Sequence, residues 1–461
     1  MTKLKENLIL ILAIFLFILL TVPFIATLPY MDGNIDFVQT NDFYSGGINQ
    51  YFSNWNTVHP PVKLLIALPF YFLFGISSVS YSFPGILIGI AGIVGIYLLT
   101  KDLFDQKTAN LTTVFFSIYP LFIANSIFVM RDYLLTIFLL ISLLFYIRKK
   151  SILYAISCSL AILTKEPALL LPSIVVVVEI IELIIKRGFN LKKTVLKITV
   201  LMAPFGVYFI WKLVLDANNK SSWNEWIFTK TENKGALSTI INNLLSFNFI
   251  NPYAFEHWKQ LFFLNFNWIY FFIILLGFAV YFLSRKKIFF YKNWRNLKVI
   301  LIIFIFSISY LLTVLSLQTY TIPRYALPLI PFILIALAKS IVIFKNLYFQ
   351  TMLILIVFGF LLTSLFFSLD PVATHLWGKT RIFDQKIYAL NDQLAGNDGI
   401  TYNIQYLLIA KNRSETILKA SKEKKPVSSP YCRWIFPDPN NETKMIKTLK
   451  IAINFDCINS N

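Results

Sequence analysis

Apolar segments that are long enough to cross a membrane follow one another along most of this chain of 461 residues. A helix of about 20 apolar residues spans the ~30 Å hydrocarbon core of a bilayer. Such segments, one of them shorter, occur at 7–28, 82–100, 108–129, 133–147, 151–164, 167–185, 194–215, 261–283, 299–318, 325–343 and 348–369. With 57% hydrophobic and 14% charged residues, the chain has more apolar surface than a soluble core can bury. We therefore expect an all-α polytopic membrane protein with about eleven transmembrane helices.

Two apolar segments need separate interpretation. The segment 7–28 is too long for the hydrophobic part of a signal peptide, and no small-x-small cleavage site follows it. We expect it to remain as a membrane anchor. The segment 63–75, which follows His59-Pro60-Pro61, is too short to span, so we expect a helix that lies in the membrane interface.

The net charge of +19 comes from 42 Lys and Arg against 23 Asp and Glu. The basic residues occur in short clusters between apolar segments rather than on one polar face, which argues against a nucleic-acid partner. With eleven spans, every cluster falls on the side of the N-terminus, and the positive-inside rule makes that side cytoplasmic. The segments 29–62, 216–260 and 319–324 and the tail are then extracytoplasmic. The protein is expected in the cell membrane.

The chain divides into a transmembrane body, 1–370, and a tail, 371–461, that we expect to form a small mixed α/β extracytoplasmic domain. A helix is predicted at 382–395 and a strand at 400–409. Cys432 and Cys457 both fall in this tail, where an oxidising compartment would permit a disulfide. No glycine-rich phosphate loop is present, so nucleotide chemistry is not indicated.

The first external segment, 29–62, is acidic. It contains Asp32, Asp36, Asp42 and His59, and no Lys or Arg occurs between Met31 and Pro61. An acidic pocket beside the membrane is one interpretation. The other is a solvated loop in which Asp32-Gly33 forms a turn and Pro60-Pro61 starts a helix.

Charged residues interrupt three apolar segments, although each charge costs about 2.5–3.5 kcal/mol at mid-membrane on insertion scales. In the predicted topology all of them lie at extracytoplasmic helix ends, on the same side as Asp32. This convergence indicates one site, whereas the alternative is interfacial anchors or local ion pairs. The three positions are Arg131-Asp132, Lys165-Glu166 and Arg324.

A family resemblance is carried by several short motifs in one order along residues 1–370. They are Asp32 with Gly46-Gly47, His59-Pro60-Pro61, Arg131-Asp132-Tyr133-Leu134-Leu135, Leu163-Thr164-Lys165-Glu166-Pro167, and Arg324-Tyr325 with Pro328 and Pro331. This set resembles the GT-C membrane glycosyltransferases. The branch it resembles most is the protein O-mannosyltransferase and aminoarabinose-transferase-like group. The tail resembles no family that we identify.

The resemblance implies a membrane enzyme that transfers a sugar from a polyprenyl phosphate to an acceptor hydroxyl, with inversion at the anomeric carbon. The acceptor would be a protein, a lipid or a glycan. A catalytic carboxylate is implied at Asp32, although Gly33 replaces the glutamate usual at the next position, which leaves Asp36 as an alternative. Asp132 resembles a second acidic position. Lys165 and Arg324 fall where basic residues of the family face the donor phosphate.

Supporting roles are implied for His59, Glu166, Arg131 and Tyr325, with no cofactor and with an open metal requirement. A multi-pass transporter is the main rival, but the charges cluster at helix ends rather than at the midplane. An oligosaccharyltransferase is a second rival, whose Trp-Trp-Asp signature is absent from this sequence. A structural scaffold is the third.

Overall fold

The computed structural model describes residues 2–26, 32–53, 59–185, 191–220, 242, 245–246, 267–283, 294–316 and 323–366, together with four two-residue strands. The elements of the N-terminal half are α1 (Thr2–Thr21), η1 (Val22–Phe24), α2 (Asp32–Ser53), α3 (Val62–Phe74), α4 (Ser78–Leu103), α5 (Gln106–Ser117), α6 (Pro120–Ile127), α7 (Arg131–Ile147), α8 (Ser151–Ile162), η2 (Glu166–Leu169), α9 (Leu170–Ile185) and α10 (Leu191–Ala217). They are followed by α14 (Asn267–Leu283), α15 (Trp294–Ser316), η6 (Pro323–Leu329), α16 (Ile330–Ile343) and α17 (Leu347–Phe366).

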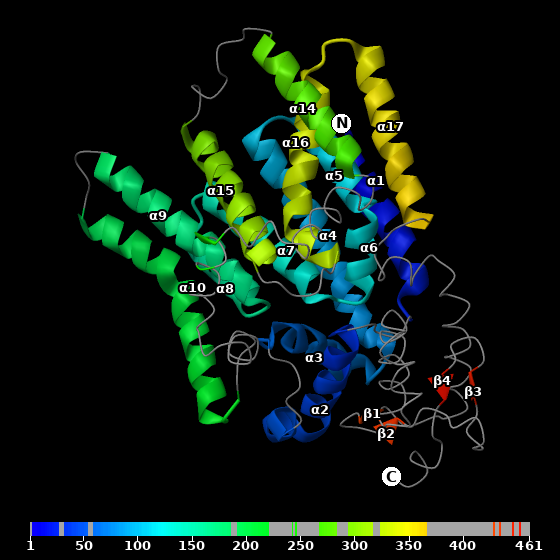
Figure 1. The fold of residues 1–461 in the computed structure, drawn as a ribbon, viewed down its shortest axis with the longest axis vertical. Helices are drawn as coiled ribbons and strands as arrows, with labels where there is room; N and C mark the ends of the chain where they lie inside the picture. The colour runs from blue at the N-terminus through cyan, green and yellow to red at the C-terminus, as the bar shows by residue number, and fades with distance from the viewer. Residues whose placement is uncertain are drawn as a thin grey trace.

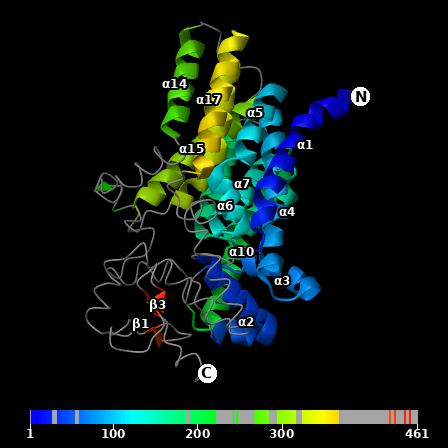
Figure 2. The ribbon, with the colours of Figure 1, turned by 90° about the vertical axis from the view of Figure 1, so that its right-hand side faces the viewer.

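The helices form one bundle whose two ends differ (Figure 1). The helices α2 and α3 lie at one end, and the N-terminus of α1 lies at the other. The view turned by 90° shows the same arrangement (Figure 2). Buried apolar side chains from nearly all of the described helices form one continuous core. The bundle therefore has a distinct end at which α2 and α3 cover the membrane helices.

Seven of the described helices are long and apolar enough to cross a membrane, and the pair α5 and α6, bent by 56°, would make an eighth. Three further expected spans correspond to α7, α8 and α14, which have 17, 12 and 17 residues. The mostly helical fold is as expected. The count of eleven and the orientation in the membrane stay predictions.

The segment 29–62 is not simply a loop, because α2 occupies Asp32–Ser53. Asp32-Gly33 opens this helix instead of forming a turn. The helix is bent at Gly47, whose φ of +67° is a conformation that glycine adopts without strain. The segment after Pro60-Pro61 is helical as expected, with Pro61 as the cap of α3. Its place in the membrane interface stays a prediction.

A glycine face on α4 allows two neighbouring helices to approach closely. A Cβ at Gly89 would overlap the ring of Phe17 on α1 and the hydroxyl of Tyr133 on α7. The same hydroxyl donates a hydrogen bond of 2.6 Å to the carbonyl of Gly85. Close approach at small residues is typical of membrane helices. It fixes the position of the first turn of α7, which carries Arg131 and Asp132.

In the tail the structure describes two antiparallel strand pairs. β1 (Val427–Ser428) pairs with β2 (Arg433–Trp434), and β3 (Met445–Ile446) pairs with β4 (Ile451–Ala452). The helix expected at 382–395, the strand expected at 400–409, and Cys432 and Cys457 lie outside the described residues. The α/β domain and its disulfide stay predictions.

Candidate active site

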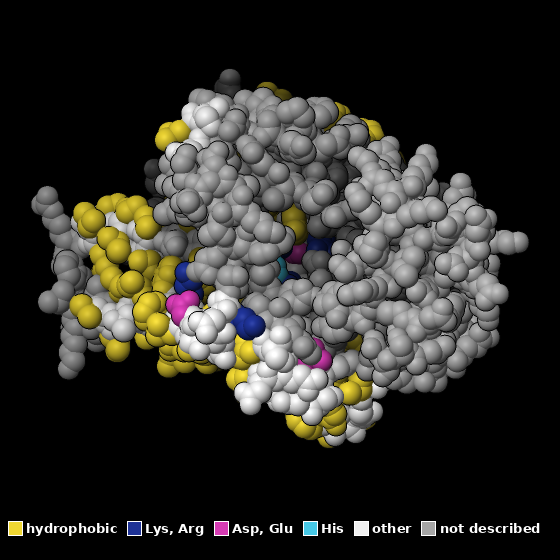
Figure 3. All heavy atoms as spheres, turned by 60° about the horizontal axis from the view of Figure 1, so that its bottom comes forward, with side chains coloured by type: hydrophobic (Ala, Val, Ile, Leu, Met, Phe, Trp, Pro, Cys, Tyr) yellow, Lys and Arg dark blue, Asp and Glu magenta, His cyan; other side chains and the backbone are white. Residues whose placement is uncertain are grey.

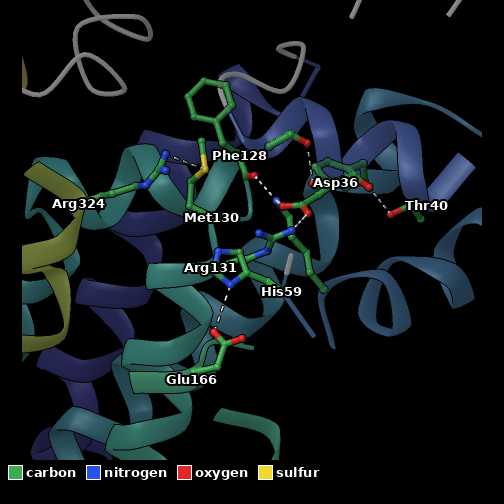
Figure 4. Close-up of polar contacts among 11 residues, drawn as sticks. Asp36, Thr40, His59, Phe128, Met130, Arg131, Glu166 and Arg324 are labelled. Carbon is green, nitrogen blue, oxygen red and sulfur yellow. Dashed lines mark hydrogen bonds and ion pairs between the residues drawn. The ribbon is translucent and has the colours of Figure 1, made fainter. Parts of the chain in front are cut away.

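Most of the charged residues singled out in the sequence meet at the end of the bundle that α2 and α3 cover (Figure 4). In a view turned toward that end, acidic, basic and histidine side chains are visible near the centre (Figure 3). These side chains come from α2, the start of α3, the first turn of α7, the junction of α8 with η2, and η6. Two carboxylates, each placed between two cations, organise the group.

The first of these carboxylates is Asp36 on α2. Its Oδ2 accepts a hydrogen bond of 2.9 Å from the ammonium of Lys63, and its Oδ1 is ion-paired with the guanidinium of Arg131. Lys63 also donates to the carbonyl of Phe128, at 3.4 Å. All three charged side chains are buried. Asp36 therefore joins α2 to α3 and α7.

The second carboxylate is Asp132 on α7. Its Oδ1 lies 2.6 Å from the ammonium of Lys165, and its Oδ2 lies 3.3 Å from Nε of Arg324. The Lys165 ammonium is also 4.1 Å from the centre of the Tyr325 ring, a cation–π contact. Arg324 further approaches the sulfur of Met130, at 3.7 Å. Asp132 thus joins α7 to the α8–η2 junction and to η6.

His59 and Glu166 form a third buried pair. Nδ1 of His59 lies 3.2 Å from Oε2 of Glu166. Burial lowers the pKa of His59, and the nearby charges of Arg131 and Lys165 lower it further, against the opposing effect of Glu166. His59 is therefore neutral at neutral pH, and its Nδ1–H donates to the Glu166 carboxylate.

Local backbone structure explains how two of these elements deliver their charges. The chain turns from α6 into α7 at Val129, whose φ of +46° is exceptional for a β-branched residue. α7 then begins with Arg131, so Asp132 lies in its first turn, where the helix dipole favours a carboxylate. At the other element, α8 ends at Ile162 and η2 starts at Glu166, with Pro167 in its first turn. Lys165 lies between them with an extended backbone.

The group combines cations and carboxylates. Among the described side chains, four buried cations, Lys63, Arg131, Lys165 and Arg324, lie with three buried carboxylates, Asp36, Asp132 and Glu166, while His59 is neutral. A buried charge is costly unless it is paired, so these side chains stabilise one another. Lys165 and Arg324, which share Asp132, are placed to contact a bound anion together.

Of the acidic residues in 29–62, Asp36 is paired with cations from α3 and α7. The convergence of charges from distant apolar segments is observed for all of the expected positions except Asp32. The side chain of Asp32 lies outside the described residues, although its backbone forms the first turn of α2, one turn before Asp36. The positions brought together are Asp36, His59, Arg131, Asp132, Lys165, Glu166, Arg324 and Tyr325.

Two members of the site were missed in the sequence. Lys63 interrupts the apolar run of α3 near its start, which is the same signal that identified Arg131 and Arg324. Tyr51 lies at the end of α2 and is buried close to Arg131 and Asp36. Burial raises the pKa of its hydroxyl, so Tyr51 keeps its proton. No sequence signal distinguishes it from the other tyrosines of the chain.

The described residues contain no group of three or more His, Cys, Asp or Glu side chains placed to hold a metal ion.

Residues 58–211 match the family described as dolichyl-phosphate-mannose-protein mannosyltransferase. The matched segment covers a third of the chain and most of the site: His59, Lys63, Arg131, Asp132, Lys165 and Glu166. Comparison with curated protein sequences gives no match. The family match confirms, over this segment, the resemblance found in the motifs.

The fold is similar to that of the archaeal oligosaccharyltransferase AglB from Archaeoglobus fulgidus, solved with an inhibitory peptide and a dolichol-phosphate. The TM-score is 0.51 at 12% identity, over 82% of this chain and 56% of that one. ArnT from Cupriavidus metallidurans, solved with undecaprenyl phosphate, matches with a TM-score of 0.46 at 16% identity, over 72% of this chain and 59% of ArnT. This chain therefore spans little more than half of each of these structures. The similarity to AglB shows a shared fold.

Proposed function

We propose that this chain is a membrane glycosyltransferase of the GT-C type, which transfers a sugar from a polyprenyl phosphate to an acceptor hydroxyl on a protein, a lipid or a glycan. The observation that carries the proposal is the cluster of buried cations and carboxylates at one end of a membrane-helix bundle. The description of the matched family names dolichyl-phosphate-mannose, and the structurally similar AglB was solved with a dolichol-phosphate. Both support a lipid phosphate as the group that these cations bind.

The donor phosphate binds at Lys165 and Arg324. A sugar linked to a polyprenyl phosphate is a phosphodiester with one negative charge, which buried cations such as these can bind. Arg324 and Lys165 come from different elements, and both contact Asp132. They are therefore close enough together to bind one anion jointly. In a partly desolvated site, such cations stabilise the charge that develops on a leaving phosphate.

The general base is Asp32. In-line attack places the base on the side of the sugar opposite the phosphate, whereas Asp132 contacts the two cations that hold the phosphate. Asp36 accepts from Lys63 and Arg131, so both of its oxygens are already engaged by cations. Asp32 is one helical turn earlier on the same face of α2, because residues four apart lie above one another.

The reaction balances in one step. The acceptor oxygen forms a bond to the anomeric carbon and its proton passes to Asp32, while the bond from that carbon to the phosphate oxygen breaks. The phosphate leaves with a second negative charge, which Lys165 and Arg324 stabilise, and the protonated carboxylate compensates for it. The anomeric configuration is inverted. The site lies on the extracytoplasmic side of the cell membrane, where no nucleotide sugar is supplied.

The test is turnover of a panel of synthetic polyprenyl-phosphate sugars by the purified chain in lipid, with an envelope fraction of the source cells as acceptor. We expect release of free polyprenyl phosphate from one member of the panel. The purified Asp32→Asn variant in the same lipid provides the control. Absence of release from every donor would contradict the proposal, and equal release by the variant would contradict the assignment of Asp32 as the base.

A further inference from the structure

A short segment that runs from His59 to Lys63, here called the proline bracket, contacts both sides of Lys165. His59 is hydrogen-bonded to Glu166, the residue after Lys165, at 3.2 Å. The backbone N–H of Val62 donates to the carbonyl of Leu163, two residues before Lys165, at 3.2 Å. The bracket therefore holds the chain on both sides of the residue that we assign to the donor phosphate.

The bracket is itself fixed to two other parts of the site. Its last residue, Lys63, donates to Asp36 on α2 at 2.9 Å and to the carbonyl of Phe128, beside α7, at 3.4 Å. Pro60 and Pro61 separate His59 from Val62, and proline restricts φ to about −65°. The distance between the two contacts around Lys165 is thus set by a stiff segment that is anchored elsewhere in the site.

The side chain of Lys165 is not held by a helix of its own, so its position depends on contacts with other segments. The chain has left α8, and Lys165 has an extended backbone with φ of −161° and ψ of 134°. No helix therefore fixes the direction of its side chain, which has a flexible four-carbon stem. The ammonium nevertheless lies 2.6 Å from Asp132 and 4.1 Å from the Tyr325 ring centre. A small rotation of the Leu163–Glu166 segment would move it away from both.

We propose that His59 is a positioning residue, which acts through Glu166 to hold the α8–η2 junction so that Lys165 faces the donor phosphate. This inference rests on the proposed function. The neutral imidazole suits the task, because it donates to Glu166 without adding a further positive charge beside Arg131 and Lys165. Direct contact of His59 with the substrate and simple packing are the alternatives that the experiment separates.

The experiment measures binding of undecaprenyl phosphate to the full chain in lipid nanodiscs, with undecaprenol as the matched probe that lacks the phosphate. His59→Leu removes the donor, and His59→Asn retains an N–H at the position of Nδ1. We expect His59→Leu to weaken phosphate binding about tenfold, the scale of one hydrogen bond to a charged group. His59→Asn should stay within about threefold of the wild type. Undecaprenol binding should not change.

A double-mutant cycle tests the path through Glu166. If His59 acts through this residue, Glu166→Leu should reproduce the loss, and the double variant should bind no worse than either single variant. Additive losses, an equal loss of undecaprenol binding, or no rescue by His59→Asn would each overturn the inference. Wild-type protein that binds both probes equally would instead overturn the proposed function. Unfolding temperatures of all variants show which of them are folded.

Discussion

Two carboxylates of α2, Asp32 and Asp36, should respond differently when each is replaced by its amide. Asp36→Asn removes the counter-ion of two buried cations, Lys63 and Arg131, and should destabilise the fold by about 3–5 kcal/mol. Asp32→Asn removes the proposed base and should lower turnover by about 10²–10⁴-fold at nearly unchanged stability and donor binding. Unfolding in denaturant and turnover, measured on both variants, separate the two roles. Near-normal turnover by folded Asp32→Asn protein would transfer the assignment of the base to Asp36 and then to Asp132.

His59 predicts how stability depends on pH. Its pKa in the folded protein is below the ordinary value of 6.5 because of burial and of the charges of Arg131 and Lys165. The unfolded chain therefore binds this proton first, and stability falls as the pH decreases below about 6.5. His59→Asn removes this contribution. Between pH 7 and pH 5, the unfolding temperature of the wild type should fall relative to that of His59→Asn. A difference that does not vary with pH would contradict the assigned shift.

At the residue scale, the sequence identified charges whose position in apolar segments is unusual. That criterion found Arg131, Asp132 and Arg324, because a charge at a membrane helix end requires a partner or a function. It does not identify the partners. The pairing of Asp36 with Lys63 joins residues on two elements that the sequence treated as a loop and an interfacial helix. Tyr51 has no charge at neutral pH and so gives no such signal.

At the element scale, α4 offers a test of helix approach. Gly89→Ala should destabilise the bundle, since the added methyl group overlaps Phe17 and Tyr133, and displacement of α7 should also weaken binding of undecaprenyl phosphate. Gly359→Ala on α17 is the matched control, because nothing lies within 4 Å of its added Cβ. That change should be neutral or stabilising by up to about 1 kcal/mol. Equal unfolding temperatures for the two variants would argue against the close packing of α4.

A second cluster joins four helices through Glu179. This buried carboxylate of α9 accepts from Tyr146 of α7 at 2.5 Å, Lys197 of α10 at 2.5 Å and Lys298 of α15 at 2.9 Å. Glu179→Gln should lower the unfolding free energy by about 1.5–3 kcal/mol, the value of hydrogen bonds that involve charged groups. Arg148→Gln, which breaks the half-exposed pair with Asp102, should cost at most about 1 kcal/mol. A larger effect of Arg148→Gln than of Glu179→Gln in thermal unfolding would contradict this order.

Elements were predictable where hydropathy alone defines them, as for α4, α10 and α17. The helix α2 was not, since its sequence is polar, contains Gly46-Gly47 and has no apolar run that a search for membrane spans detects. Its stability comes from tertiary contacts, such as the Tyr81 hydroxyl that donates to the Gly33 carbonyl at 2.9 Å. The interruption at Lys165, by contrast, was predictable from the sequence. Apolar runs on both sides of it indicated where a helix must end.

At the scale of the whole molecule, the orientation in the membrane follows from charge and from the direction of individual helices. α7 starts at the site and ends next to exposed Lys149, so Lys149 belongs to the opposite end of the bundle. α10 runs the other way, and exposed Asn219 follows its end beside α2 (Figure 1). The basic clusters predict that the end with Lys149 is cytoplasmic.

Cysteine labelling tests this orientation in a background in which Cys158, Cys432 and Cys457 are replaced by serine. An impermeant thiol reagent applied to intact cells should label Asn219→Cys and leave Lys149→Cys unlabelled until the membrane is permeabilised. Both positions are exposed in the fold, so a difference between them reports sidedness rather than burial. The reverse pattern would place the buried charges on the cytoplasmic side. The extracytoplasmic location in the proposed function would then be wrong, and a nucleotide sugar would become an available donor.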